Sequence, residues 1–375
     1  MREVLDSALS WWRQGHSVGM ATVVATFRSA PRPAGASMLV GPRGQAVGSV
    51  SGGCLEGTVY ELAQSVIESG VPVLQRYGVS EETAFSVGLT CGGILDVYVE
   101  RIDRRSFPEL EAIANDIVCG RPVAVATLVE HPNPSRVGAR LVVRPGTERG
   151  GSLGSDRLDD AVTDDALGLL ASGLNSTLLY GPEGERRGEG VRVFVRACAP
   201  PPRMLVFGAI DFAAAVARIG SFLGYQVAVC DARPVFATCD RFPSADEVVV
   251  DWPHRYLRKE AESGRIDGRS VLCVLTHDPK FDVPLLTVAL NLPEVGYVGA
   301  MGSRRTHEDR LARLRDAGVT DVQLSRLASP IGLDLGARTP EETAVSIAAE
   351  VIALGWGGSG RRLTGTADRI HHHTS

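Results

Sequence analysis

The sequence has no long apolar run, no signal-peptide pattern and no concentration of basic residues. No apolar stretch approaches the roughly 20 residues that a membrane-spanning helix needs. The N-terminus carries Glu3 and Asp6 where a signal peptide would carry positive charge and then an apolar core. The 39 Lys and Arg residues are dispersed among 44 Asp and Glu residues, whereas nucleic-acid-binding proteins usually have a basic surface. We therefore expect a cytoplasmic protein with no membrane span and no nucleic-acid partner.

The seven cysteines form neither a disulfide framework nor a zinc-binding pattern. They are widely spaced, their number is odd, and no two are arranged as CxxC. We expect these thiols to be reduced. Five cysteines lie in segments with strand or helix patterns and are predicted to be packing residues: Cys119, Cys198, Cys230, Cys239 and Cys273.

Glycine and proline are abundant, with 42 and 21 residues, and a run of three prolines marks a domain boundary. Ala199-Pro200-Pro201-Pro202 separates two strand-like segments, and consecutive prolines cannot continue a helix. Residues 1–199 mix helix and strand patterns irregularly, which predicts an α+β domain. Residues 203–356 alternate short strands with helices, which predicts a Rossmann-like domain with a doubly wound parallel sheet. Residues 357–375 are expected to form a tail.

The first strand of the predicted parallel sheet ends in a glycine loop. Compared with the dinucleotide-binding pattern G-x-G-x-x-G/A, Gly208 and Ala213 occupy the first and third glycine positions, but the second is Ile210. A β-branched side chain at that position obstructs the approach of a pyrophosphate. Asp231 ends the second strand, where an acid would hold ribose hydroxyls. Two interpretations of the loop remain: a dinucleotide site, or a glycine kept only for its turn.

A polar cluster follows the fourth strand of the same sheet. Thr276, His277 and Asp278 can orient a ligand or take part in acid/base chemistry. Alternatively, Asp278 caps the next helix and Pro279 begins it. We favour a binding site, because capping does not require His277.

A second polar group follows the fifth strand, at the predicted start of a helix. Gly302, Ser303 and Arg304 combine exposed backbone donors, a hydroxyl and a guanidinium, which suits a phosphate or a similar anion. The carboxyl ends of parallel strands share one edge of a sheet. We therefore expect this group to face the same crevice as the glycine loop and the cluster after the fourth strand.

Two glycine–cysteine loops distinguish the N-terminal domain, at residues 48–57 and 91–93. Paired glycines expose backbone N–H groups that form anion-binding concavities, called nests. A cysteine at a predicted helix N-terminus has its thiolate favoured, although a neighbouring glutamate opposes this. A thiolate beside a nest suits a soft metal or an anionic, sulfur-bearing ligand; the alternative is a small buried cysteine in each turn. The candidate binding residues are Ser51, Gly52, Gly53, Cys54, Glu56, Cys91, Gly92 and Gly93.

Several segments resemble one known family. They are GSVSGGCLEG (48–57), CGG (91–93), VLTHDPKFD (274–282), YVGAMGSRRTHEDR (297–310) and SPIGLDLGARTPEETAVSIAAEVI (329–352). These blocks resemble the XdhC/CoxI family of xanthine dehydrogenase accessory proteins and occur in order along nearly the whole chain. The resemblance implies a protein that binds the molybdenum cofactor and assists its sulfuration and its insertion into a molybdenum hydroxylase.

The resemblance also implies a site and partners. It puts the cofactor near the glycine–cysteine loops, with Cys54 and Cys91 as candidate molybdenum ligands. The implied partners are a hydroxylase of the xanthine dehydrogenase or CO dehydrogenase type and a cysteine desulfurase, and we expect a homo-oligomer, such as a homodimer. Relatives usually have G-x-G-H in the Rossmann loop, whereas this chain has Ile210 and Asp211 in place of the second glycine and the histidine. We therefore expect NAD(P) to bind weakly or not at all.

Three functions are compatible with these patterns. The first is a non-catalytic chaperone for the molybdenum cofactor. The second is an NAD(P)-dependent oxidoreductase that uses the Rossmann-like domain, and Ile210 counts against it. The third is a structural adaptor between a hydroxylase and a sulfurtransferase, which would need neither cysteines nor glycine nests.

Overall fold

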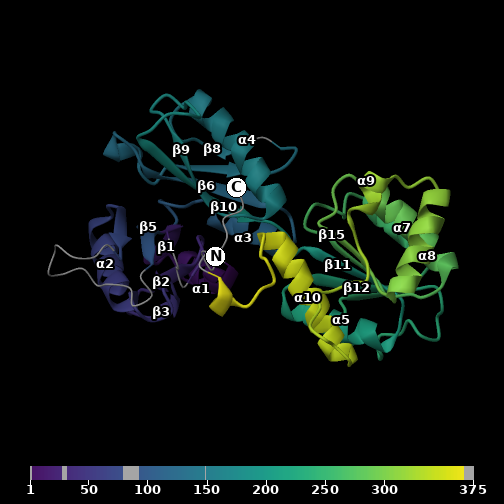
Figure 1. The fold of residues 1–375 in the computed structure, drawn as a ribbon. Helices are drawn as coiled ribbons and strands as arrows, with labels where there is room; N and C mark the ends of the chain where they lie inside the picture. Colours follow the sequence, from purple (N-terminus) through teal and green to yellow (C-terminus); the bar gives the residue numbers. More distant parts are fainter. Residues whose placement is uncertain (1, 28–31, 79–92, 148, 367–375) are drawn as a thin grey trace. The chain divides into compact units, whose positions relative to one another are not determined.

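The computed structural model describes residues 2–27, 32–78, 93–147 and 149–366. Its contacts divide the chain into two compact units, one up to Pro200 and one from Pro201 onward (Figure 1). No helix in these described ranges is both long enough and apolar enough to cross a membrane.

The first unit contains two antiparallel sheets of five strands each. The strand orders are β3-β2-β1-β5-β4 and β8-β7-β6-β10-β9. The first sheet consists of β1 (Val18–Phe27), β2 (Ser37–Val40), β3 (Ala46–Gly48), β4 (Val73–Tyr77) and β5 (Ile94–Ile102). The second consists of β6 (Val123–Glu130), β7 (Arg140–Val143), β8 (Gly150–Gly151), β9 (Ser176–Tyr180) and β10 (Val191–Cys198).

Helices cover these sheets, and the two sheets share a core. The helical segments are α1 (Arg2–Arg13), α2 (Glu56–Ser69), α3 (Leu110–Val118), α4 (Asp156–Ser172) and a 3-10 turn at Pro134–Arg136. Val24 and Tyr98 of the first sheet pack with Val129 and Phe194 of the second. The predicted α+β class is confirmed, with antiparallel pairing that the sequence did not specify.

The second unit contains a six-stranded parallel sheet, as predicted. Its strand order, β13-β12-β11-β14-β15-β16, is that of dinucleotide-binding Rossmann folds. The strands are β11 (Arg203–Phe207), β12 (Gln226–Asp231), β13 (Glu247–Val250), β14 (Val271–Val274), β15 (Tyr297–Ala300) and β16 (Leu327–Ala328). The order reverses between β11 and β14, so the expected ligand crevice of this fold lies at the carboxyl ends of these two strands.

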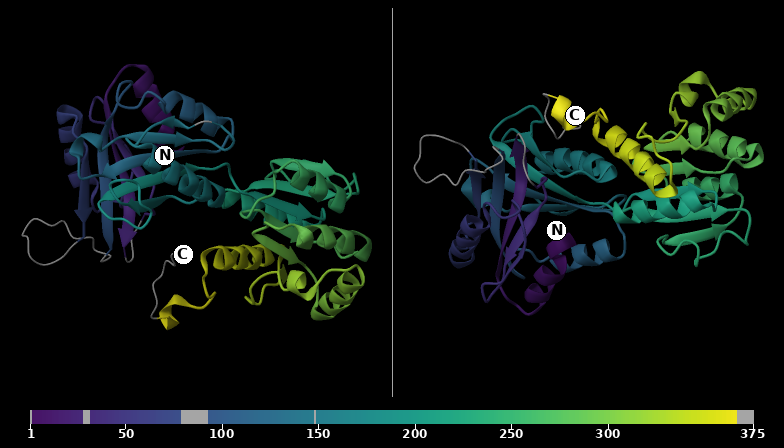
Figure 2. Two further views of the ribbon diagram at one scale, coloured as in Figure 1. Left: turned by 90° about the horizontal axis from the view of Figure 1, so that it is seen from above. Right: turned by 60° about the horizontal axis from the view of Figure 1, so that its bottom comes forward.

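Helices lie on both faces of the parallel sheet (Figure 1 and Figure 2). The helices are α5 (Asp211–Phe222), α6 (Pro253–Glu262), α7 (Pro279–Asn291), α8 (Arg304–Asp316), α9 (Asp321–Leu324) and α10 (Pro340–Trp356). Helices α5 and α10 contribute to one core cluster, and α6, α7 and α8 contribute to the other. Helix α10 begins with a capping box formed by Thr339 and Glu342. In the predicted tail, a 3-10 turn covers Leu363–Gly365.

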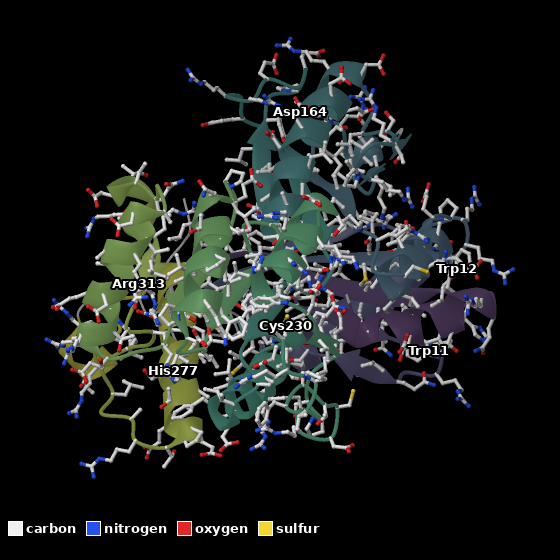
Figure 3. The ribbon with its side chains drawn as sticks, turned by 90° about the vertical axis from the view of Figure 1, so that its right-hand side faces the viewer. Trp11, Trp12, Asp164, Cys230, His277 and Arg313 are labelled. Atoms are coloured by element: carbon white, nitrogen blue, oxygen red, sulfur yellow. The ribbon has the colours of Figure 1, made fainter. Side chains whose placement is uncertain are left out.

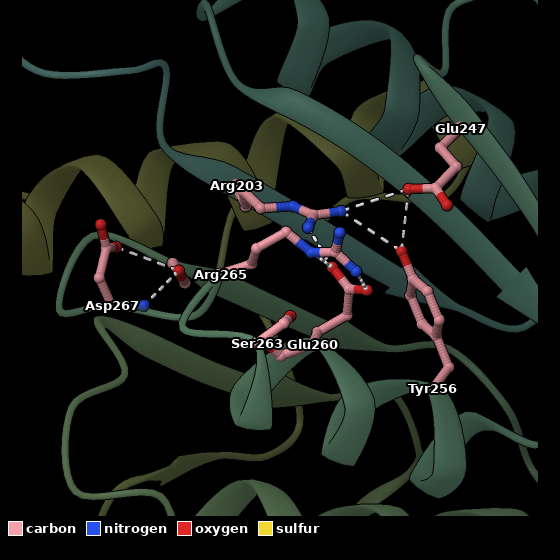
Figure 4. Close-up of polar contacts among 8 residues, drawn as sticks. Arg203, Glu247, Tyr256, Glu260, Ser263, Arg265 and Asp267 are labelled. Atoms are coloured by element: carbon pink, nitrogen blue, oxygen red, sulfur yellow. Dashed lines mark hydrogen bonds and ion pairs between the residues drawn. The ribbon is translucent and has the colours of Figure 1, made fainter. Parts of the chain in front are cut away.

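A buried ion-pair network stabilises the amino edge of this sheet. Glu260 of α6 is completely buried and accepts hydrogen bonds from Arg203, the first residue of β11, and from Arg265. The hydroxyl of Tyr256 donates a bond of 3.1 Å to Glu247 beside them (Figure 4). The network lies at the opposite ends of the strands from the expected ligand crevice.

The predicted packing role holds for three of the five cysteines. Cys198, Cys230 and Cys273 are buried, but Cys119 and Cys239 are exposed. Cys119 is the C-cap residue of α3, and Cys239 lies in the turns between β12 and β13. Both were predicted wrongly because they lie beyond the end of an element, where the apolar pattern no longer implies burial.

Candidate functional site

The glycine loop after β11 touches the loop after β14. Gly208 has a φ of 106°, and a Cβ added to it would lie 2.8 Å from the side chain of Thr276. A larger residue would therefore be strained and would also collide with the neighbouring loop. The structure brings Gly208 and Thr276 together at the crevice, as strand order requires.

Asp231 closes the glycine loop from the side of β12. Its buried carboxylate accepts a hydrogen bond of 2.7 Å from the N–H of Ala209 and forms an ion pair of 2.8 Å with Arg233. Burial alone would raise the pKa of Asp231, but the bonds from Arg233 and Ala209 outweigh it and hold the pKa below its ordinary value. The acid that the sequence offers for ribose hydroxyls is thus already engaged within the protein.

The start of α5 is poorly suited to a pyrophosphate. Ile210 is the N-cap residue of α5 and packs against the apolar core on that face of the sheet. Asp211 places an exposed carboxylate in the first turn of the helix, 3.3 Å from Arg241. A negative charge at this position repels the phosphates that a helix N-terminus otherwise attracts. These contacts support the expectation that NAD(P) binds weakly, which stays a prediction.

A buried network links the loop after β14 to the loop after β15. The hydroxyl of Thr276 donates to Asp282, whose other oxygen accepts a bond of 3.0 Å from Arg310. Arg310 also donates to the carbonyl of Met301 at 2.7 Å and to the hydroxyl of Ser329 at 3.0 Å. Burial raises the pKa of Asp282 despite these bonds.

The sequence pattern did not indicate a role for Arg310. Arg310 is one of several arginines along α8, and no local pattern marks it as buried. Its interaction with Asp282 fixes the two loops to each other and so determines the shape of the crevice edge.

Asp278 caps a helix, which was the less favoured of its two predicted roles. It is the N-cap residue of α7, accepts a hydrogen bond of 3.1 Å from the N–H of Lys280, and forms an ion pair with its ammonium group. Pro279 is the first residue of the helix. His277 is exposed in the loop between β14 and α7 and remains available to a ligand (Figure 3).

The start of α8 has the arrangement expected of a helix cap. Ser303 is its N-cap residue and accepts a hydrogen bond of 3.1 Å from the N–H of Thr306. Gly302 precedes it with a φ of 157°. Arg304 is exposed in the first turn. Helices α7 and α8 cover the same face of the sheet, and His277 and Arg304 lie near the starts of these two helices, at the carboxyl edge of the sheet.

The nest in the first glycine–cysteine loop is filled by the chain itself. The carboxylate of Glu56, the first residue of α2, accepts hydrogen bonds from two serine hydroxyls and from five backbone N–H groups. The hydroxyls belong to Ser49 and Ser51, and the N–H groups to Val50, Ser51, Gly52, Gly53 and Leu55. Burial alone would raise the pKa of Glu56, but these bonds outweigh it and lower the pKa far below its ordinary value.

This arrangement corrects the prediction that the nest is open to a ligand. The loop does bind an anion, but the anion is the side chain of Glu56. Glycines are required because Gly52 and Gly53 have φ values of 78° and 126°. Cys54 is exposed just before α2, so the carboxylate orders the loop that presents this cysteine.

The second glycine–cysteine loop falls only partly within the described ranges. Cys91 and Gly92 lie outside the described residues, and Gly93 is buried immediately before β5. Among the described residues, no three His, Cys, Asp or Glu side chains are grouped so that they could hold a metal ion. The proposal that Cys54 and Cys91 both contact molybdenum therefore remains a prediction.

Comparisons with known proteins agree along both units. Residues 204–351 match the XdhC Rossmann domain, and residues 11–78 and 119–181 match the XdhC and CoxI family. A protein of Bacillus subtilis described as a probable xanthine dehydrogenase subunit is 28% identical over 335 residues, covering 89% of this chain and 92% of that protein. The molybdenum cofactor insertion chaperone PaoD of Escherichia coli is 25% identical over 353 residues, covering 94% of this chain and 88% of PaoD.

The fold also matches a solved structure. A crystal structure described as a xanthine dehydrogenase from Bacillus halodurans has a TM-score of 0.68 and 25% sequence identity, and the match covers 97% of this chain and 98% of that one. The matched ranges of the two family descriptions lie on both sides of the boundary at Pro200. The chain belongs to the XdhC and CoxI family.

Proposed function

We propose that this protein binds the molybdenum cofactor as cargo and assists its sulfuration and its insertion into a molybdenum hydroxylase of the xanthine dehydrogenase type. The observation that carries the proposal is the similarity to a molybdenum cofactor insertion chaperone along 94% of the chain. The similarity to a probable xanthine dehydrogenase subunit over 89% of the chain supports a hydroxylase as the partner. A cysteine desulfurase is the further partner that sulfuration would require.

In this proposal, Cys54 is the residue of the first unit that contacts the cargo. Its thiol is exposed and is a soft donor suited to a metal that already has sulfur ligands. Glu56 would hold the loop, and the rigid loop would reduce the entropy lost when the cargo binds. The role of Glu56 is therefore to position Cys54, not to contact the metal.

The second unit has a candidate anion site of its own, which we propose separately from the cysteine loop. Arg304 at the start of α8 is an exposed guanidinium next to backbone donors, which suits a phosphate such as that of the cofactor or of a nucleotide. His277 lies at the same edge of the sheet, just before α7. These groups can bind and orient an anion.

The test is cofactor retention by a cysteine variant with a matched control. Cys54→Ser, Cys119→Ser and the wild type are purified from a host that makes the molybdenum cofactor. Cys119 is the control because it is also an exposed cysteine of the first unit, outside the glycine loop. We expect Cys54→Ser to retain several-fold less molybdenum and pterin per chain than the other two proteins, at equal melting temperature.

The same preparations test delivery of the cargo. Loaded wild-type protein should activate an apo-hydroxylase in the presence of a cysteine desulfurase and a sulfur source, and Cys54→Ser should activate it less. Equal molybdenum content in all three proteins would contradict the role of Cys54. Absence of pterin from every preparation would contradict the proposed function itself.

A further inference from the structure

Helix α10 is apolar on two of its sides. Its inner side is buried in the core that it shares with α5, and the residues there include Ala344, Ile347 and Val351 (Figure 1). Its outer side carries a row of four apolar residues: Val345, Ala349, Ile352 and Trp356. The side chains of Val345, Ile352 and Trp356 are 49%, 45% and 53% exposed. A helix on the surface of a protein normally carries polar residues on its outer side, and a helix that is apolar all round is normally buried.

The spacing of this outer row is that of a helix–helix contact. Its members are separated by four, three and four residues, which is the repeat of a coiled-coil seam. Between Thr343 and Trp356 the sequence has one charged residue, Glu350. Its carboxylate accepts hydrogen bonds from the hydroxyl of Tyr297 and, at 2.8 Å, from the N–H of Gly332. The outer row is therefore uninterrupted by charge and suits a second helix better than water.

The outer row is complementary to itself when two copies of α10 lie antiparallel. In that alignment Ala349 of each helix faces Ile352 of the other, and Val345 faces Trp356. A small side chain thus meets a large one at every contact, which is how two helices pack closely. The antiparallel alignment also places the dipoles of the two helices in their favourable relative orientation.

The charges at the two ends of α10 fit the same alignment. Glu341 lies in the first turn, and Arg361 and Arg362 follow the end of the helix. All three side chains are exposed, and none forms an ion pair with another described residue. Two antiparallel copies bring the acidic end of each helix to the basic end of the other, whereas a parallel pair would bring like charges together.

We propose that the outer side of α10 is the interface between two copies of this chain, packed antiparallel about a twofold axis. Such an interface uses the same surface on both copies, so its residues must be complementary to themselves. The outer row and the end charges of α10 meet this condition together. The proposal gives the expected homodimer a surface, and it does not depend on the proposed cofactor function.

The experiment is sedimentation velocity of the full-length wild type, Ile352→Glu and Leu354→Glu over a series of concentrations. Leu354 is the matched control, because it is 63% exposed on the same helix but points away from the outer row. We expect a wild-type dimer that dissociates on dilution. Ile352→Glu should raise its Kd about tenfold or more, because a carboxylate would be buried against Ala349, and Leu354→Glu should change it by less than about twofold.

Charge reversal tests the antiparallel alignment. The pair of substitutions Arg361→Glu and Arg362→Glu should weaken the dimer several-fold, and Glu341→Arg added to them should restore it. A wild type that stays monomeric at every concentration would overturn the proposal, and so would a dimer that Ile352→Glu leaves intact. A monomeric wild type that binds an apo-hydroxylase through this side of α10 would overturn it as well. Failure of Glu341→Arg to restore the dimer would overturn the antiparallel arrangement.

Discussion

Replacing Glu56 by glutamine would remove the charge around which the first glycine–cysteine loop is organised. In the native protein this carboxylate accepts seven hydrogen bonds from the residues just before and around it. Glutamine has almost the same shape, but one of its two terminal groups is an NH₂ donor that cannot accept the N–H groups of the nest. The substitution therefore tests the charge and the acceptor oxygens while leaving the packing of α2 unchanged.

The size of the effect follows from these contacts. A hydrogen bond to a charged group contributes roughly 1.5–3 kcal/mol to stability. The seven contributions do not add, because they converge on two oxygens and Glu56 is partly exposed to water. We therefore expect Glu56→Gln to lower the free energy of unfolding of the first unit by about 2–4 kcal/mol.

The assay is urea unfolding over a range of pH, with Glu61→Gln as the control. Glu61 lies on the same helix but is exposed, so its substitution should change stability by less than about 0.5 kcal/mol. Folding lowers the pKa of Glu56 from its ordinary value of 4.5. Its stabilisation is therefore present above pH 4.5 and is lost as the pH falls below that value. The stability difference between the wild type and Glu56→Gln should shrink on acidification. A difference that stays constant below pH 4.5 would refute the reasoning. So would a destabilisation by Glu56→Gln that is no larger than the destabilisation by Glu61→Gln.

Two further predictions concern the second unit. Glu260→Gln should lower its free energy of unfolding by about 3 kcal/mol, because the guanidinium of Arg203 would lose its buried carboxylate and keep only the ion pair of 3.4 Å to Glu247. Urea unfolding beside the exposed control Glu262→Gln measures this, and equal stability of the two variants would contradict it. Micromolar NAD should not shift the melting temperature, because Ile210 and Asp211 obstruct a pyrophosphate. A ligand present at 100 times its Kd adds about 2.7 kcal/mol to the free energy of unfolding. A clear shift in a thermal melt would therefore show that the loop accepts the nucleotide.

For the second unit, the sequence alone determined the kind of sheet and the place of its loops. Strands that alternate with helices must run parallel, since each helix returns the chain to the same edge of the sheet. Gly208, Thr276 and Ser303 each follow a strand closely, so their presence at one edge was predictable. Helix capping by Thr339 was predictable for a similar reason, because a cap depends on residues only a few positions apart.

For the first unit, the sequence determined little beyond the class of fold. Its strands pair in the order β3-β2-β1-β5-β4 and β8-β7-β6-β10-β9, which joins segments that are distant along the chain. Alternation of apolar residues identifies a strand, but it does not say which other strand is its partner. The buried ion pair between Glu100 of β5 and Arg140 of β7 could therefore not be predicted, because it depends on how the strands of both sheets are ordered.

Only the tertiary structure decided which partner each polar group has. From the sequence, the nest of residues 48–57 and the carboxylate of Asp231 were both candidate groups for binding a ligand. In the fold, the carboxylate of Glu56 fills the nest, and Asp231 is paired with Arg233. Arg310 could not be told apart from the exposed arginines of its helix until the helix was packed. The physical reason is that a hydrogen bond depends on distances of a few tenths of an ångström and on burial. A sequence specifies the donors and acceptors, whereas packing decides which of them meet and which remain open to a ligand.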